Sequence, residues 1–180
     1  MKYMKLLGVL VASVLLATSV VAAPATNAPA ADSGLGQWTL SLSGAGSTSL
    51  TSDSKYDSSA VGAQFELGHD GKFILPLTAG VRQGVAWGDS DGSEWQFTTR
   101  VFNDWTLIRL GNLQLDAGGN VGLNYGTKGE PRWVAAPEVV GRLYLKKDVD
   151  MFARVEYPFD LNAGRAENTL TYVLGVRIRF

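Results

Sequence analysis

Apolar side chains alternate strictly with small or charged ones along the last nine residues of the chain. Because successive side chains of a strand point to opposite faces, this pattern predicts a β-strand with one apolar face. The apolar face consists of Tyr172, Leu174, Val176, Ile178 and Phe180. The opposite face ends on Arg177 and Arg179. One face suited to lipid and one suited to a polar interior are typical of the closing strand of a transmembrane β-barrel.

Seven further segments alternate in the same way and are separated by residues typical of turns. They lie near 38–43, 61–68, 77–87, 95–101, 113–125, 138–146 and 151–157. Their second face is rich in Gly, Thr, Ser and Gln, with single charges of both signs. Such a face suits a narrow barrel, in which small residues leave room for a few long ones. We therefore predict an all-β fold over residues 35–180, an antiparallel up-and-down transmembrane barrel of eight strands.

Alternation alone would also suit a soluble sandwich, whose apolar faces lie inside. The aromatic residues favour the membrane barrel, because amphipathic rings prefer the two membrane interfaces. One group falls near the predicted outer ends of the strands and consists of Trp87, Trp95, Tyr125, Tyr157 and Tyr172. A second group falls near the periplasmic ends and consists of Trp38, Trp105 and Phe180.

Residues 102–110 (FNDWTLIRL) break the alternation, because Leu107 and Ile108 are adjacent apolar residues. We predict one long strand with a β-bulge near Asn103 and Asp104. The alternative is an extra hairpin, which would give ten strands. Residues 105–110 are short for that alternative, because a tilted spanning strand needs about 9–11 residues.

The first 22 residues predict a cleaved signal peptide. Lys2 and Lys5 precede the apolar segment 6–16, and small residues follow as far as Ala22. The alternative is an uncleaved anchor, although the first half of the apolar stretch is shorter than the about 20 residues of a spanning helix. Residues 23–34 predict a flexible leader, because they are rich in Pro, Ala and Ser and show no periodicity.

The connections predict the orientation of the barrel. Short links follow Leu67, Leu110 and Leu145, and they alternate with polar loops near 47–58, 88–94, 126–136 and 158–168. In bacterial barrels the short turns face the periplasm and the long loops face outward. We therefore expect an outer-membrane protein with both termini in the periplasm.

Composition excludes several classes of partner. Cleavage would remove two of the 16 basic residues and none of the 17 acidic ones, which leaves 14 against 17 and a net charge of −3. Such a chain lacks the basic footprint of a nucleic-acid-binding protein. It contains no Cys, which excludes disulfides and thiolate metal sites. We expect no cofactor and no metal site.

The charged residues on the predicted interior face form a candidate network. They are Glu66, Arg82, Arg100, Asp116, Glu138, Arg142, Arg154, Glu156, Arg177 and Arg179. An unpaired charge away from water is very costly, so we expect acids such as Glu66, Glu138 or Glu156 to hold Arg177 and Arg179. Because an eight-stranded barrel is only just wide enough for its own side chains, a salt-bridged plug is favoured over an ion path or gate.

Enzymatic chemistry has little support in the sequence. General-base catalysis at neutral pH usually calls for histidine, and His69 is the one histidine of the chain. It lies at the predicted inner end of its strand, away from the outer leaflet. The acidic loop 89–94 could place oxygens around Ca²⁺, but it lacks the EF-hand spacing and suits a hairpin loop equally well.

Residues 35–180 resemble the small eight-stranded outer-membrane barrels of the OmpA/OmpX-like group. The resemblance is one of architecture, and it includes a closing segment with Leu174, Val176, Ile178 and a terminal Phe180. It implies insertion by the barrel-assembly machinery, which reads that strand, and contact with outer-membrane lipid and lipopolysaccharide. It implies no single activity. We expect a non-enzymatic barrel with a structural or surface-interaction role and an unknown surface ligand, with a narrow ion or small-solute channel as the alternative.

Overall fold

The computed structural model describes residues 36–50, 60–72, 74–88, 94–127, 130–167 and 169–180. The strands are β1 (Trp38–Ser49), β2 (Ala60–Lys72), β3 (Pro76–Gly88), β4 (Glu94–Leu110), β5 (Leu113–Gly126), β6 (Arg132–Lys146), β7 (Val149–Glu156), β8 (Phe159–Asp160), β9 (Arg165–Ala166) and β10 (Thr169–Arg179). No helix in the described part of the chain is long and apolar enough to cross a membrane. The predicted signal segment and leader lie outside the described residues.

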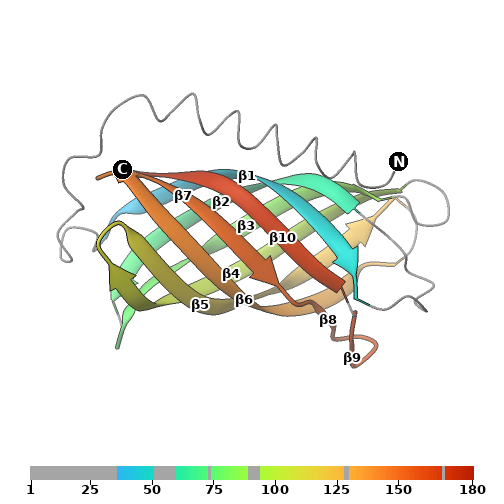
Figure 1. Cartoon of the computed structure of the whole chain (residues 1–180). Coiled ribbons are helices and arrows are strands. Elements are labelled where there is room, and N and C mark those ends of the chain that lie inside the picture. The colour runs from blue at the N-terminus through green and yellow to red at the C-terminus, as the bar shows by residue number, and fades with distance from the viewer. Residues whose placement is uncertain (1–35, 51–59, 73, 89–93, 128–129, 168) are drawn as a thin grey trace.

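Eight of these strands close into an antiparallel barrel (Figure 1). Each strand from β1 to β6 pairs with the next one along the chain, and β10 pairs with both β7 and β1. The short strands β8 and β9 form a small hairpin that extends beyond the wall, where β8 pairs with β6. The prediction of an eight-stranded up-and-down barrel is therefore confirmed.

The barrel has two distinct ends. At one end, called here the terminal end, β1 begins at Trp38 and β10 finishes at Arg179; the other is called the loop end. Gly111-Asn112 links β4 to β5 at the terminal end, and Gly111 has a φ of 59°. A two-residue hairpin turn of this kind needs a positive φ, which glycine adopts without steric cost.

The stretch 102–110 belongs to β4, so the alternative with an extra hairpin is wrong. The predicted bulge exists, but its position is corrected: the register with β5 shifts between Thr106 and Ile108, and Asn103 and Asp104 are in regular register. The inserted residue is Leu107. It brings Leu107 and Ile108 both to the exposed side, which accounts for the adjacent apolar pair in the sequence.

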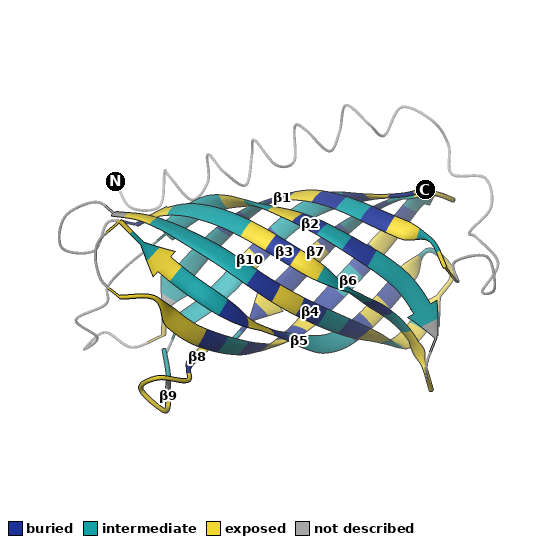
Figure 2. Cartoon of the chain, turned by 180° about the vertical axis from the view of Figure 1, so that it is seen from behind, coloured by how far each residue is buried: buried dark blue, intermediate teal, exposed yellow. Residues whose placement is uncertain are grey.

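Exposed and buried residues alternate along the strands (Figure 2), and the faces of the barrel are inverted relative to those of a soluble protein. Outward-facing apolar side chains are exposed, at 66% for Leu42, 54% for Val101 and 49% for Ile178. Inward-facing Arg82 and Asp116 are exposed by only 1% and 0%. An exterior wall of this kind is stable only against an apolar solvent, which makes the fold that of a transmembrane barrel.

Two predicted connections are corrected. The short link predicted to follow Leu67 lies further along the chain, because β2 continues to Lys72 and β3 begins at Pro76. The loop predicted over 126–136 is shorter, because β6 begins at Arg132. In both places a turn-like composition hid residues that continue the strand alternation.

Candidate functional site: the charged barrel interior

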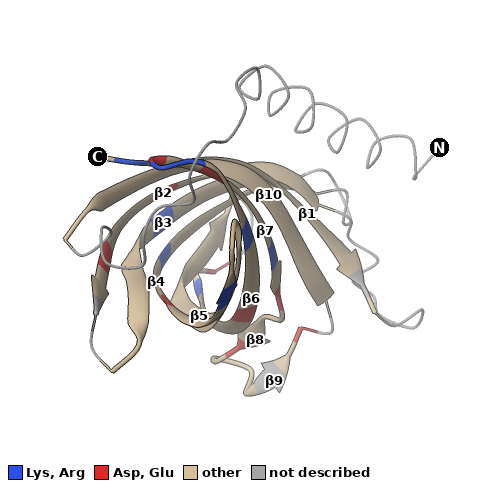
Figure 3. Ribbon diagram, turned by 60° about the vertical axis from the view of Figure 1, so that its left-hand side comes forward, with Lys and Arg blue, Asp and Glu red and all other residues tan. Residues whose placement is uncertain are grey.

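All ten residues of the predicted interior network are buried inside the barrel. The charged positions of the strands around the lumen can be followed in Figure 3. The residues separate into two groups by height. We call Glu66, Arg82, Arg100, Glu138, Arg154 and Glu156 the central cluster. The remaining four, Asp116, Arg142, Arg177 and Arg179, join three further acids in the terminal-end cluster described below.

Arg82 is the hub of the central cluster. Its Nε donates to Glu66 Oε1 at 2.7 Å, and its two Nη atoms donate to both Glu138 carboxylate oxygens at 2.9 and 3.2 Å. Its Nη1 also donates to Glu156 Oε1 at 3.1 Å. Arg82 lies on β3 and Glu156 on β7, which are opposite each other in the strand order. The guanidinium of Arg82 therefore links opposite walls across the lumen.

Two further arginines complete the central cluster. Arg154 donates from Nε to Glu156 at 2.7 Å and from Nη1 to Glu66, and Ser41 donates to the same Glu66 carboxylate at 3.1 Å. Arg100 reaches Glu156 at 3.1 Å from the far side of the lumen. Every carboxylate of the cluster contacts at least two arginines, as ion pairs away from water require.

Arg177 and Arg179 have partners other than those predicted. They bind neither Glu66, Glu138 nor Glu156; Arg177 Nε donates to Asp150 at 3.0 Å and Arg179 Nε donates to Asp70 at 2.9 Å. The predicted partners belong to the central cluster, nearer the loop end. Near the end of β10, the acids at the same height in the barrel are Asp70 on β2 and Asp150 on β7. The register of the strands therefore decides which acids pair with Arg177 and Arg179.

Arg142 forms the other half of the terminal-end cluster. It donates to Asp104 at 3.2 Å and pairs with Asp116. Tyr144 connects the two halves of the cluster. Its hydroxyl accepts from Arg179 Nη2 at 3.1 Å and donates to Gln114 at 2.7 Å, and Gln114 in turn donates to Asp116 at 2.8 Å. The terminal-end cluster thus contains Asp70, Asp104, Asp116, Arg142, Asp150, Arg177 and Arg179.

Three acids of this cluster were missing from the predicted network. Asp70 has the same strand parity as Glu66, Asp104 the same as Arg100, and Asp150 the same as Arg154. Extending the alternation by one or two steps would have found all three. They were missed because Asp70 precedes a glycine, Asp104 lies in the irregular stretch and Asp150 follows a turn.

The closing-strand residues lie as the alternation requires. Tyr172, Ile178 and Phe180 are exposed, and Leu174 and Val176 also face outward. Between them Gly175 leaves room inside, because a Cβ there would come within 2.8 Å of the Phe152 ring. His69 packs edge-to-face against Trp38 with ring centroids 5.1 Å apart, at the terminal end.

A third, smaller group of charges lies at the loop end. Arg132 lies 3.5 Å from Asp160 and 3.7 Å from Glu167, and Asn162 Oδ1 accepts from the Trp133 backbone at 2.8 Å. Burial raises the pKa of the Glu167 carboxyl, and the Arg132 guanidinium opposes this only in part. The acidic loop 89–94, which was considered for Ca²⁺, lies outside the described residues except for Glu94.

No family model matches the chain, and no curated protein is similar enough in sequence to count as a relative. Solved structures are similar in fold. The crystal structure of Neisserial surface protein A (NspA) matches with a TM-score of 0.60 and 12% identity, covering 79% of this chain and 97% of that one. A de novo designed transmembrane β-barrel matches with a TM-score of 0.51 and 13% identity, covering 81% and 97%. The predicted likeness to small eight-stranded barrels is confirmed; the finer grouping with OmpA and OmpX remains a prediction.

Proposed function

We propose that this protein is an outer-membrane barrel with a structural or surface-interaction role and without enzymatic activity. The observation that carries the proposal is the charged bridge in the middle of the lumen. Arg82 binds carboxylates on both sides of the barrel, and Arg100 and Arg154 bind the same acids. A lumen crossed by ion pairs favours a rigid support over a solute path.

The location and orientation rest on the exterior and on the connections. The exposed apolar wall needs a membrane, and closed barrels of this size are typical of outer membranes. The terminal end has turns as short as Gly111-Asn112 and Lys147-Asp148, and the β8–β9 hairpin extends from the other end. By the rule for bacterial barrels, the terminal end faces the periplasm and the loop end faces outward.

The partners follow from that orientation. We propose that the barrel-assembly machinery recognises the closing strand through Phe180 and the apolar residues before it. The loop end then meets lipopolysaccharide, where Arg132 is exposed enough to contact anionic groups. The connections at this end are where a surface ligand would bind, since loops on a rigid scaffold are the usual binding sites.

Location is tested by cell fractionation combined with a heat-shift gel. We expect the protein in the outer-membrane fraction, with faster migration before boiling than after it, because the closed barrel resists detergent. Recovery in the soluble periplasmic fraction with no heat shift would overturn the proposal.

The plug is tested by conductance in planar bilayers with refolded protein. We expect a silent bilayer at protein amounts for which a known porin gives steps. Steady and reproducible steps from the wild type would favour the narrow channel instead. Steps that arise only in Arg82→Ala would support the plug, because that substitution removes the bridge.

A further inference from the structure

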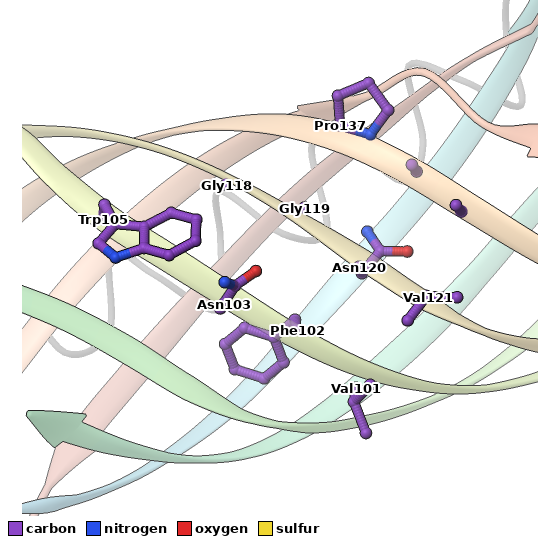
Figure 4. A pocket seen from close by; sticks show the side chains of 11 residues that line it. Val101, Phe102, Asn103, Trp105, Gly118, Gly119, Asn120, Val121 and Pro137 are labelled. Atoms are coloured by element: carbon purple, nitrogen blue, oxygen red, sulfur yellow. The ribbon is translucent and has the colours of Figure 1, made fainter. Parts of the chain in front are cut away.

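The outer wall has a hollow over β4, β5 and β6 (Figure 4). Ala79, Asn103, Gly119 and Pro137 are register partners on β3 to β6, so small side chains and one carboxamide lie in a row across the wall. Val101 and Trp105 flank Asn103 on β4 and are exposed at 54% and 37%. Between them and the bare backbone of Gly119 lies an open groove of about 600 Å³.

Asn103 is a polar residue on the lipid-facing side without a partner. It alternates with the buried Phe102 and Asp104, and no described residue forms a hydrogen bond with its carboxamide. Thr99, four residues before Asn103 on the same face, is different: it donates to Gln83 at 3.1 Å and lies 3.5 Å from the Tyr125 hydroxyl. The wall thus satisfies one of its polar residues and leaves Asn103 unsatisfied.

The depth of Asn103 decides which kind of partner can reach it. Trp38, His69, Ala79 and Asn103 are consecutive register partners from β1 to β4. Neighbouring strands are about 4.8 Å apart and tilted by about 40°, so each step from one register partner to the next moves about 3 Å toward the loop end along the barrel axis. Three such steps place Asn103 about 10 Å above Trp38. Trp95 lies eight residues before Asn103 on β4, about 20 Å nearer the loop end. Lipid ester groups lie at the edges of the hydrocarbon, so a neighbouring lipid tail offers Asn103 no hydrogen bond.

We propose that this wall is the interface of a homodimer in the membrane, with the two Asn103 carboxamides on its two-fold axis. Each carboxamide then donates an N–H to the carbonyl oxygen of the other, which satisfies both. The small residues beside them let the two walls approach closely, as they do between membrane helices.

The sizes of the neighbouring side chains fit this symmetry. Because the strands are tilted, Val101 and Gly119 lie at about the same height on opposite sides of Asn103, and so do Trp105 and Ala79 further down. A two-fold axis along the membrane normal leaves the depth of each residue in the membrane unchanged and exchanges the left and right sides of the wall. Val101 of each copy therefore faces the Gly119 hollow of the other, and Trp105 faces Ala79. The contact is self-complementary: a large residue meets a small one at both levels.

The absence of cysteine in the chain allows a direct test. Asn103→Cys places one thiol on the proposed axis, and Ala153→Cys places one at an exposed position on β7, three strands away around the barrel. In phospholipid vesicles under mild oxidation, we expect Asn103→Cys to form disulfide-linked dimers about tenfold faster or more. Adding Gly119→Leu, which fills the hollow, should abolish the difference, whereas adding Ala63→Leu elsewhere on the lipid face should not. Equal rates for the two single-thiol variants would overturn the proposal.

A second measurement keeps Asn103 intact. Energy transfer between donor- and acceptor-labelled Ala153→Cys proteins reports dimerisation from a position outside the proposed interface. Asn103→Val should weaken the dimer by about threefold to tenfold, the usual range for one polar contact between membrane segments. Ala63→Val is the matched control and should leave transfer unchanged. Transfer that does not depend on Asn103 would assign the groove to lipid or to another protein. A monomer that still fractionates with outer membranes would overturn the dimer alone.

Discussion

The two interior clusters use acids of different length. The central cluster contains three glutamates and three arginines, whereas the terminal-end cluster contains four aspartates and three arginines. The ion pairs of the central cluster that span the most strands join opposite walls, such as Arg82 on β3 with Glu156 on β7. The aspartates bind arginines one or two strands away, as Asp150 does with Arg177. The longer acid therefore occurs where the carboxylate must approach the barrel axis.

One position of the terminal-end cluster differs in its access to water. The side chains of Glu138, Glu156, Asp116 and Asp150 are exposed by 0% or 1%, while the Asp70 side chain is exposed by 14%. Desolvation of a charge costs most where no water remains, so a lost partner should matter least beside Asp70. The central cluster thus links opposite walls across the lumen, whereas the terminal-end cluster links strands that are one or two positions apart.

The largest effect is expected from Arg82→Ala. The substitution removes four hydrogen bonds to three glutamates and leaves those carboxylates with an excess of negative charge. We expect the free energy of unfolding to fall by about 3–5 kcal/mol, measured by urea titration of protein refolded into vesicles.

The control for Arg82→Ala is Arg132→Ala at the loop end, where the arginine side chain is 45% exposed. Its loss should cost less than about 1 kcal/mol, because water replaces the ion pair. If both substitutions lower the free energy of unfolding by the same amount, the central cluster does not stabilise the barrel.

The positions on the two faces were accessible from sequence, but the pairs were not. Alternation alone identifies Arg82 and Glu156 as inward-facing, because the period of a strand is two. Their contact depends on how far each strand is shifted against the next around the closed barrel, and no short sequence pattern encodes that sum. For the same reason Arg177 was assigned to glutamates, although the shift brings it level with Asp150.

The bulge and Asn103 illustrate a second limit. Adjacent Leu107 and Ile108 reveal that one residue is inserted, yet pairing with β5 decides where the register shifts. Asn103 reads as a turn residue in sequence. Only the regular register of β4 shows that it lies on the lipid-facing wall, and so the predicted bulge site became a candidate interface.

Arg177→Ala should cost less than Arg82→Ala, at about 1–3 kcal/mol. Arg179 still lies 2.9 Å from both Asp70 and Asp150, so neither acid loses all its partners. The variant should unfold at lower urea concentration and stay silent in bilayers. Unchanged stability together with a new conductance would identify Arg177 as a gate and favour the channel function.

Glu138→Asp tests whether acid length matters in the centre. The charge is kept, but the carboxylate retracts by one methylene from Arg82 Nη1 at 2.9 Å and Asn120 Nδ2 at 2.7 Å. We expect a loss of about 1–2 kcal/mol from the weakened hydrogen bonds. Asp70→Glu, the opposite exchange at the most exposed acid of the terminal-end cluster, should cost less. A tolerated Glu138→Asp would show that only charge is required.

The smallest effect on stability is expected at the loop end, where the charged groups are more exposed to water than those in the two interior clusters. Burial raises the pKa of Glu167 above its ordinary value of 4.5, despite Arg132 at 3.7 Å. The folded state therefore holds this proton more tightly than the unfolded chain does. Its stabilising contribution is complete below pH 4.5 and is lost as the pH rises through the folded pKa.

Glu167→Gln cannot titrate, so its urea midpoint should fall less between pH 4.5 and 7 than that of the wild type. The difference should stay under about 1 kcal/mol, because the group lies near water. A midpoint of Glu167→Gln that falls as steeply as the wild type's would show that burial at the loop end carries no penalty, and the contrast with the central cluster would widen.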